Sequence, residues 1–381
     1  MTEWKEYKLG EIVTFQRGHD LPKDKMIDGD IPVAGSNGII GYHNQFTKEG
    51  PGVTIGRSGN IGIPHYYPNA YWAHNTVLYV VDFKGNDAKF MYYLLKTFDF
   101  TQLNTGSAVP SLNRNHIHEL PVSIPDVPTQ HRIASILSSL DDKIDLLHRE
   151  NATLEQMAET LFRQWFVVEA KEEWEEGKLG DYVDETIGGE WGKENPEGDF
   201  IKPVQCIRGT DIADLSVGLA TKTPIRYVKE SKFEKIEPRN GDIIMEISGG
   251  TENQSTGRVA YVNDGVKILF DYPIIFSNFC RLLRVKEEHT YFIYCYLKYL
   301  YEQDEFFNLE NGSSGIKNLD YKALLYELTY PMPNDKQQIL DFNDKVSVYF
   351  ERINRNKQQI QTLIQMRDGL LPKLMSNEIQ L

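Results

Sequence analysis

The stretch that decides the architecture is a heptad run over residues 129–165, which reads TQHRIASILSSLDDKIDLLHRENATLEQMAETLFRQW. Apolar side chains recur in it at alternating spacings of four and three from Ile133 to Trp165, with a polar interruption at Asn151. This is the a/d pattern of a coiled-coil seam, and it predicts one long helix that begins after Pro128. Its seam positions include Leu137, Leu140, Ile144, Leu147, Asn151 and Leu154.

A second run of the same kind follows Pro333. Asn334, with Gln337 three residues later, has the spacing of a capping box at the start of this helix. Gly369 and Pro372 predict that the helix ends or kinks there. Its seam positions include Val346, Ile353, Asn356, Ile360, Leu363 and Leu370.

Two helices with one apolar stripe each should pair with each other. We expect antiparallel pairing, because the first helix leads into a second globular segment and the second helix leads away from it. Asn151 opposite Asn356 would fix the register at some cost in stability, as a buried Asn pair does in coiled coils. Alternatively, both Asn residues are solvated defects. The paired register sets Leu137 against Leu370, Ile144 against Leu363 and Leu154 against Ile353.

The rest of the chain is internally repeated. Residues 4–13, WKEYKLGEIV, share six of ten positions with residues 174–183, WEEGKLGDYV. Such self-similarity, kept in order along the chain, indicates a duplication. We expect the second copy to carry an insertion within residues 185–214. Further echoes link Gly56-Arg57 with Gly257-Arg258, Asn75 with Asn278, and residues 90–96 with residues 292–298.

These patterns predict an α+β (mixed α/β) fold, because short β-rich runs alternate with helices. Two globular domains related by pseudo-two-fold symmetry would be separated by two long antiparallel coiled-coil helices. The aromatic run at 290–301 is expected to be an amphipathic helix that covers a sheet. The predicted segments are a first domain (1–128), a first long helix (129–173), a second domain (174–333), and a second long helix with the C-terminal segment (334–381).

Composition narrows the classes of function. The 41 Lys and Arg against 55 Asp and Glu give a net charge of −14, so no bulk attraction to nucleic acid or anionic membrane is expected. The N-terminus lacks a signal peptide and no apolar run is long enough to span a bilayer, which predicts a cytoplasmic protein with no membrane partner. Cys206, Cys280 and Cys295 have no paired spacing, so neither a disulfide framework nor a metal site is expected.

Eight segments, taken in order, resemble the specificity subunit of type I restriction-modification systems. The resemblance covers essentially the whole chain, and it depends on the order of the segments together with the duplication and both heptad helices. The segments are IPVAGSNGIIGY (31–42), VTIGRSGNIG (53–62), GSAVPSL (106–112), QHRIASILSSLDDKI (130–144), LFRQWFV (161–167), IRGTDI (207–212), GDII (241–244) and MRDGLLPKLMS (366–376).

The resemblance implies a non-catalytic subunit. Such a subunit reads a bipartite target in double-stranded DNA, one half-site per target-recognition domain, and binds two adenine-N6 methyltransferase (M) subunits through its helices. Restriction (R) subunits join through them. The chain itself would bind no cofactor, since S-adenosylmethionine and ATP belong to the partner subunits. In agreement, the sequence has no Walker-type or H-E-x-x-H motif. The alternatives are a coiled-coil scaffold or a DNA-binding adaptor outside any restriction system.

Reading DNA requires polar side chains at base edges and at phosphates. For each candidate the alternative is an ordinary turn residue or surface charge. Three aromatic residues at the end of the first helix, Phe162, Trp165 and Phe166, are candidates to dock the second domain, a methyltransferase subunit, or both. The DNA-binding candidates are Arg17, His19, Arg57, Ser58, Asn60, Ser107 and Arg114 in the first domain, and Asn253, Gln254, Ser255, Arg258 and Lys317 in the second.

Overall fold

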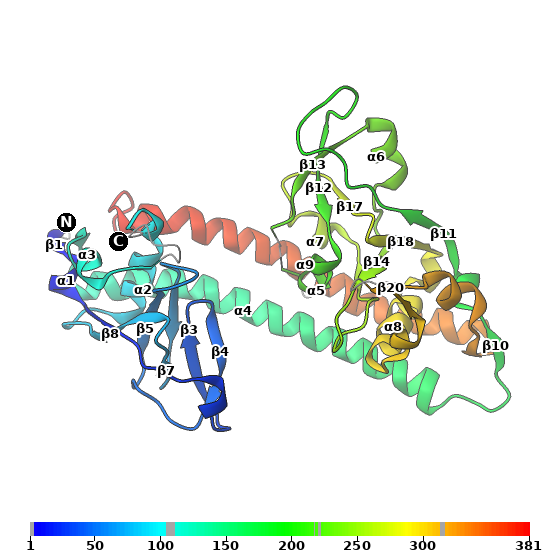
Figure 1. The fold of residues 1–381 in the computed structure, drawn as a ribbon, viewed down its shortest axis with the longest axis horizontal. Helices are drawn as coiled ribbons and strands as arrows, with labels where there is room; N and C mark the ends of the chain where they lie inside the picture. The colour runs from blue at the N-terminus through cyan, green and yellow to red at the C-terminus, as the bar shows by residue number, and fades with distance from the viewer. Residues whose placement is uncertain (1–3, 104–110, 217, 220–221, 313–316) are drawn as a thin grey trace. The chain divides into compact units, whose positions relative to one another are not determined.

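The computed structural model describes residues 4–103, 111–216, 218–219, 222–312 and 317–381. The chain divides into two compact units. Unit 1 comprises residues 1–143 with 363–381, and unit 2 comprises residues 144–362. Each is an α+β domain that includes part of both long helices, α4 (Val127–Arg163) and α9 (Lys336–Met375) (Figure 1). The α+β fold class is therefore confirmed.

The described residues of unit 1 form three sheets. The largest is antiparallel in the order β2-β8-β5-β6; the second has the order β4-β3-β7, with β3 parallel to β7; the third pairs β1 with β9. Its short helices are α1 (Leu9–Ile12), α2 (Ala88–Lys96) and α3 (Arg114–His118). Its strands are β1 (Lys5–Lys8), β2 (Thr14–Arg17), β3 (Ile31–Gly35), β4 (Gly38–His43), β5 (Gly52–Gly56), β6 (Pro64–Tyr67), β7 (Trp72–Ala73), β8 (Val77–Asp82) and β9 (Pro121–Ile124).

Unit 2 repeats these sheets as β11-β18-β14-β16, β13-β12-β17 and β10-β21, and adds a small sheet of β15, β20 and β19. Its helices are α5 (Ile212–Ser216), α6 (Glu230–Ile236), α7 (Asp264–Lys267) and α8 (Thr290–Glu302). Its strands are β10 (Glu175–Gly177), β11 (Val183–Gly188), β12 (Lys202–Ile207), β13 (Ile225–Val228), β14 (Ile243–Glu246), β15 (Ser248–Gly249), β16 (Val259–Tyr261), β17 (Ile274–Phe276), β18 (Cys280–Val285), β19 (Glu310–Asn311), β20 (Lys317–Leu319) and β21 (Tyr330–Met332).

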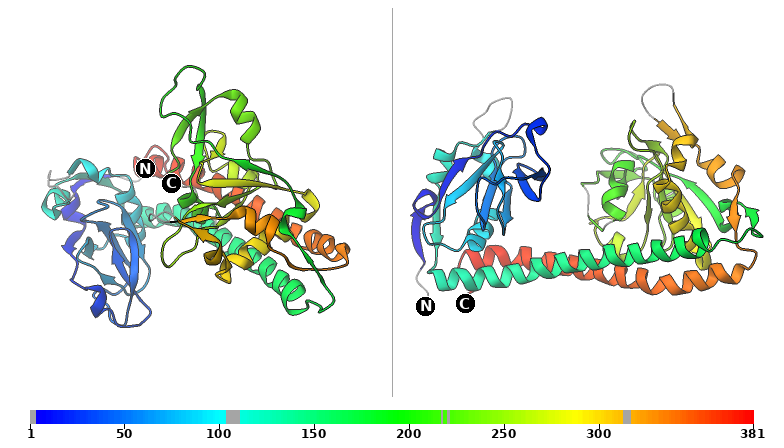
Figure 2. Two further views of the ribbon diagram at one scale, coloured as in Figure 1. Left: turned by 45° about the vertical axis from the view of Figure 1, so that its right-hand side comes forward. Right: turned by 90° about the horizontal axis from the view of Figure 1, so that it is seen from below.

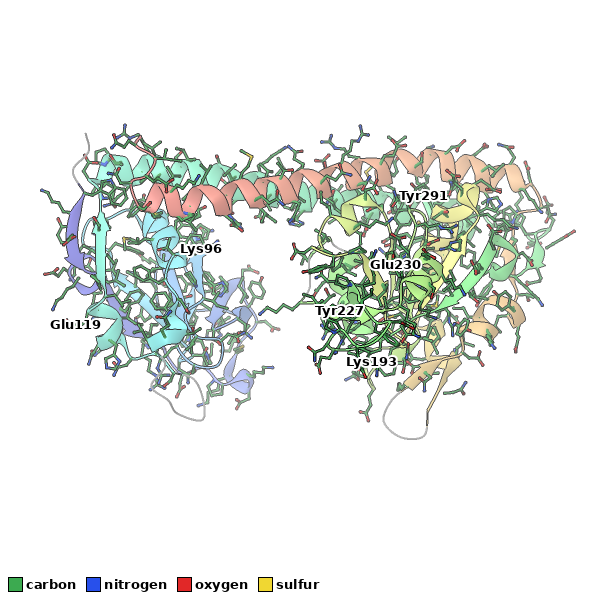
Figure 3. The ribbon with its side chains drawn as sticks, turned by 90° about the horizontal axis from the view of Figure 1, so that it is seen from above. Lys96, Glu119, Lys193, Tyr227, Glu230 and Tyr291 are labelled. Atoms are coloured by element: carbon green, nitrogen blue, oxygen red, sulfur yellow. The ribbon has the colours of Figure 1, made fainter. Side chains whose placement is uncertain are left out.

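Helix α8 confirms the prediction of an amphipathic helix over residues 290–301. Phe292, Ile293 and Leu297 are completely buried in the same core as Ile243 and Leu283 of the large sheet of unit 2. The aromatic stripe therefore belongs to the domain core. Figure 3 shows one member of it, Tyr291, beside α9.

Both long helices form, but their ends differ from prediction. The Asp335 carboxylate accepts a hydrogen bond from the backbone N of Gln337 at 2.9 Å, so Asp335 caps α9. The expected cap by Asn334 was wrong, because its side chain bonds the backbone of Glu173 and Glu175. Helix α9 also continues through Pro372 to Met375. Burial of Leu374 and its neighbours in the core of unit 1 offsets the hydrogen bond lost at the proline.

The predicted register of the two helices is confirmed by a direct bond. Asn356 Nδ2 donates to Asn151 Oδ1 at 2.9 Å, and both residues are buried. In unit 2, Leu154 and Ile353 lie in one core, and in unit 1, Leu137 and Leu370 share another. Figure 2 shows α4 and α9 side by side within each unit. All of the predicted seam residues are buried or half-buried.

The duplication is confirmed in the hydrogen bonding as well as in the order of the strands. The backbone N of Lys8 donates to the Glu11 carboxylate at 2.7 Å, and that of Lys178 donates to Asp181 at 3.4 Å. The two ten-residue echoes therefore build the same turn.

One predicted echo was wrong. The counterpart of Gly257 is Gly62, not Gly56. Both have positive φ, 125° and 76°, and a Cβ on either would collide with Phe306 or Phe100 respectively. Only glycine suits such a position. The constant numbering offset between the two copies gave the wrong match, because the loop between β14 and β16 in unit 2 is longer than the loop between β5 and β6 in unit 1.

The expected position of the insertion was also wrong for the most part. Residues 18–30 and 189–201, which connect equivalent strands, are equal in length. The largest extra segment is residues 208–224, which carry α5 and replace the two-residue turn 36–37 of unit 1. Smaller additions carry α6 and α7. The extra residues are thus spread over several connections between strands.

Replacing both seam asparagines, Asn151 and Asn356, should separate the effect of this pair on stability from its effect on helix register. Asn151 Nδ2 has no hydrogen-bond partner among the described residues, so the pair is only partly satisfied. We expect Asn151→Leu/Asn356→Leu to raise the free energy of unfolding by about 1 kcal/mol, and either single Leu variant to lower it by about 1–3 kcal/mol. Chemical unfolding measures this, and cysteine cross-linking across the seam reports the register. Unchanged stability and register in the double variant would contradict a role for the pair.

Candidate functional site

In unit 1, three strands of the large sheet bring several predicted residues to one edge. Strand β2 ends at Arg17, β5 ends just before Arg57, and β8 begins just after Thr76. The backbone N atoms of Arg57 and Ser58 both donate to Thr76 O, at 2.8 and 3.2 Å. We call Arg17, His19, Arg57, Ser58 and Asn75 the unit 1 edge.

The unit 1 edge is cationic. Arg57 Nη1 donates to Asn75 O at 3.1 Å. Burial lowers the pKa of Arg57, and the nearby charge of Arg17 lowers it further. His19 Nε2 lies 3.3 Å from the Tyr79 hydroxyl. The Asn75 amide donates to the Asp20 carboxylate. The two guanidinium groups and the hydroxyl beside them form a surface suited to a ligand rich in hydrogen-bond acceptors.

The remaining candidates of unit 1 lie in other places. Asn60 is exposed in the loop between β5 and β6, and Arg114 is exposed at the start of α3. Ser107 lies outside the described residues.

Unit 2 has an equivalent edge with the same backbone bonds. The N atoms of Ile247 and Ser248 both donate to Phe279 O, at 2.9 and 3.2 Å. Ser248 therefore occupies the position of Ser58, Ile247 that of Arg57, and Asn278 that of Asn75. We call Ser248, Asn278 and Phe279 the unit 2 edge.

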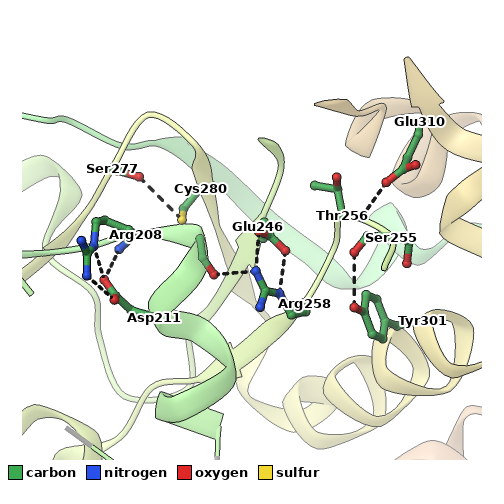
Figure 4. Close-up of polar contacts among 11 residues, drawn as sticks. Arg208, Asp211, Glu246, Ser255, Thr256, Arg258, Ser277, Cys280, Tyr301 and Glu310 are labelled. Carbon is green, nitrogen blue, oxygen red and sulfur yellow. Dashed lines mark hydrogen bonds and ion pairs between the residues drawn. The ribbon is translucent and has the colours of Figure 1, made fainter. Parts of the chain in front are cut away.

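A pocket of about 670 Å³ opens at the unit 2 edge. Glu246, which lines it, and the neighbouring Asp211 are each paired with an arginine (Figure 4). Glu246 binds the Arg258 guanidinium through two bonds of 2.7 and 2.8 Å, and Asp211 binds Arg208 through bonds of 2.8 and 2.9 Å. The lining includes Trp191, Arg208, Glu246, Ser248, Asn278 and Phe279.

Arg258 is committed to this internal network. Its Nη2 also donates to Gly209 O at 3.1 Å, and the hydrogen bonds that Arg258 donates to the Glu246 carboxylate raise the pKa of Arg258. The Arg258 side chain is only 19% exposed, and Glu246 is almost fully buried. The pair joins β14 to the start of β16.

The other predicted residues of unit 2 also lie away from the unit 2 edge. Ser255 is buried, and its carbonyl accepts a bond from the Tyr301 hydroxyl at 3.2 Å. Lys317 pairs with Glu310 at 2.8 Å. Asn253 and Gln254 are exposed on a turn after β15. The repeat of Asn75 as Asn278 was the one sequence signal that pointed to the unit 2 edge.

The aromatic residues at the end of α4 pack within unit 2. Phe162 and Phe166 are buried, and Phe166 contacts the rings of Phe292 and Phe342 at 4.8 and 5.2 Å. Trp165 is half-buried beside Phe342. These residues dock the second domain onto α4 and α9.

No group of three or more His, Cys, Asp or Glu side chains in the described ranges is arranged to hold a metal ion, and none of the helices there combines the length and apolarity of a membrane span. All three cysteines are buried, and burial raises the pKa of the Cys206 and Cys280 thiols to about 12.

Removing the Arg258 side chain should destabilise unit 2. Arg258→Ala would leave Glu246 buried without its counter-charge, which costs about 3–5 kcal/mol. Denaturant unfolding should register this loss, and Glu246→Gln/Arg258→Ala should recover part of it. If Arg258→Ala keeps the wild-type stability, the ion pair contributes little to folding, and Arg258 becomes a candidate for DNA contact again.

Comparison with known proteins identifies the chain. The family model described as type I restriction modification DNA specificity domain matches residues 1–156 and 171–362. The MjaIX type I restriction enzyme specificity subunit of Methanocaldococcus jannaschii is 27% identical over 324 residues, covering 78% of this chain and 70% of the relative. The HindI specificity subunit of Haemophilus influenzae is 26% identical over 194 residues, covering 44% of this chain and 41% of the relative.

A solved structure has the same fold. The crystal structure of the type I restriction-modification S subunit from M. genitalium aligns with a TM-score of 0.59 and 17% identity, covering 98% of this chain and 96% of that one. With a family model matched over both halves of the duplication, and a fold shared along the whole chain, this protein belongs to the type I restriction-modification DNA specificity family.

Proposed function

We propose that this chain selects the DNA target of a type I restriction-modification complex and has no catalytic site of its own. Each unit would read one half of a bipartite target in double-stranded DNA. The observation that carries the proposal is the pair of equivalent edges. The same backbone bonds in both units present side chains that differ, with Arg57 in one and Ile247 in the other. A shared backbone framework with different side chains is suited to two domains that recognise different DNA sequences.

The partners would be two methyltransferase (M) subunits bound to the long helices, with restriction (R) subunits joined through them. S-adenosylmethionine and ATP would be bound by those partners, and the complex would act in the cytoplasm. Support for docking comes from apolar side chains exposed on otherwise polar helices. Leu146 and Met157 on α4 are 48% and 45% exposed, and Val348 on α9 is 59% exposed. Contiguous apolar patches mark protein interfaces, whereas single exposed apolar side chains are common on any surface, so these three residues serve as candidate contact positions for the methyltransferase subunits.

The net charge of −14 supports a division of labour in DNA binding. Contacts to phosphates supply most non-specific affinity for DNA, and they require clustered Lys and Arg. Of the two edges, only the unit 1 edge is cationic. We therefore infer that tight binding needs the methyltransferase subunits.

Mapping N6-methyladenine tests the function. The chain is co-expressed with a candidate type I adenine methyltransferase subunit from the same genome, in a host without adenine methylation, and the host genome is sequenced for modified bases. A bipartite methylated motif is expected. A complex that assembles but leaves no motif would favour the scaffold alternative, and methylation that does not depend on this chain would favour an adaptor outside the system.

Arg57→Ala tests the contribution of unit 1. If Arg57 donates to a guanine edge, its loss should cost about 1–3 kcal/mol of discrimination and relax one half of the motif. Binding of the assembled complex to matched and mismatched duplexes measures this. Arg132→Ala is the control, because Arg132 is an exposed arginine on α4 of the same unit. Equal affinity and an unchanged motif in Arg57→Ala would remove Arg57 from the reading surface.

A further inference from the structure

The two edges are equivalent in backbone but opposite in chemistry. Gly18 and Gly189 both lie against the backbone that connects the next two strands, so a Cβ on Gly18 would meet His74 O and one on Gly189 would meet Ser277 O. The backbone N atoms of the following residues, His19 and Glu190, donate to Ala73 O and Phe276 O at 2.7 and 2.9 Å. The two edges can therefore be aligned residue by residue.

This alignment replaces each cationic group of the unit 1 edge. Arg17 corresponds to Gly188, His19 to Glu190 and Arg57 to Ile247. Asn is kept, as Asn75 and Asn278, but its surroundings differ. In unit 1 the carbonyl of Asn75 accepts from Arg57, and in unit 2 the residue that corresponds to Arg57 is Ile247.

The unit 2 edge is partly aromatic and less cationic than the unit 1 edge. Glu190 adds a carboxylate, which accepts from the backbone N of Gly192, and the Arg281 guanidinium lies against Gly188. Glu246 and Asp211 are each bound to an arginine, so neither offers a free charge. Phe279 is 55% exposed and Trp191 is 37% exposed, and both line the pocket. The Trp191 ring is held from outside by the Arg226 guanidinium, 4.3 Å from its centroid. Lys193, two residues after Trp191, and Tyr227, the residue after Arg226, lie on the side of unit 2 away from α9 (Figure 3).

Asn278 offers its amide to this pocket. It is exposed, and its side chain makes no hydrogen bond within the described ranges. An Asn amide can donate to adenine N7 and accept from adenine N6 at the same time, and a phenyl ring packs against the C5-methyl group of thymine. The major groove presents both features on one A·T pair.

We propose that the unit 2 edge reads an A·T pair, with Asn278 on the adenine and Phe279 against the thymine methyl. This inference rests on the proposed function and deepens it. It moves the reading surface of unit 2 away from Asn253, Gln254, Ser255 and Arg258. It also makes the two half-sites chemically different, because the unit 1 edge carries arginines where the unit 2 edge carries Ile247 and Phe279.

The methylation map tests the assignment. Asn278→Ala and Phe279→Ala complexes should each lose preference at one A·T position, in the same half of the motif, by about tenfold or more in the ratio of methylated sites. The other half should stay intact. Gln254→Ala is the matched control, since Gln254 is an exposed amide on a turn of the same unit, and it should leave the motif unchanged. A motif unaltered in both edge variants, or altered only by Gln254→Ala, would overturn the proposal.

Replacing the thymine by uracil isolates the methyl contact. The wild-type complex should bind a duplex with uracil at that position about fivefold or more weakly than one with thymine, whereas Phe279→Ala should bind both equally. Equal binding of both duplexes by the wild type would overturn the Phe279 contact.

Two measurements distinguish a failure of this proposal from a failure of the proposed function. Thermal unfolding of the edge variants should match the wild type, because both side chains are exposed; a loss of stability in Asn278→Ala and Phe279→Ala would show a structural role and overturn the proposal. A wild-type complex that produces no bipartite motif would instead refute the proposed function itself.

Discussion

The structure depends on the need to cover the apolar stripes of α4 and α9. Each helix would expose a seam many turns long if it stood alone. Helix α4 contributes Ile133 and Leu137 to the core of unit 1, and Phe162 to that of unit 2. The segments 127–143 and 363–381 are distant in sequence, yet together they complete unit 1. The globular units are thus built on the helix pair rather than attached to it.

The buried Asn pair gives this arrangement its register. A shift of either helix would set each Asn against an apolar side chain and lose the bond between Asn356 Nδ2 and Asn151 Oδ1. Ion pairs flank the seam in the same antiparallel sense. Arg352 binds Glu150 in unit 2, and Arg367 binds Asp141 in unit 1, both at 2.8 Å. The polar contacts select one alignment among several that the apolar residues would tolerate.

The recognition edges show how one fold supports different specificities. Backbone bonds to Thr76 O in unit 1 and to Phe279 O in unit 2 fix the course of the chain regardless of the side chains. The side chains at these positions are then free to differ, as Arg57 and Ile247 do. Buried ion pairs such as that of Glu246 with Arg258 stabilise the loops behind the edge without appearing on it.

The sequence by itself determined the two long helices, their antiparallel register, the duplication and the family. These features follow from heptad spacing, from one Asn in each seam and from repeated local turns, all of which are periodic or local. Only the tertiary structure decided which residues of the two units are equivalent at the edges. Loops of unequal length change the numbering offset between the two copies. Gly257-Arg258 therefore has the same sequence as Gly56-Arg57 but does not occupy the equivalent position in the structure. Likewise, the burial of Ser255 and the pairing of Arg258 depend on Tyr301, Gly209 and Glu246, which a linear pattern does not bring together.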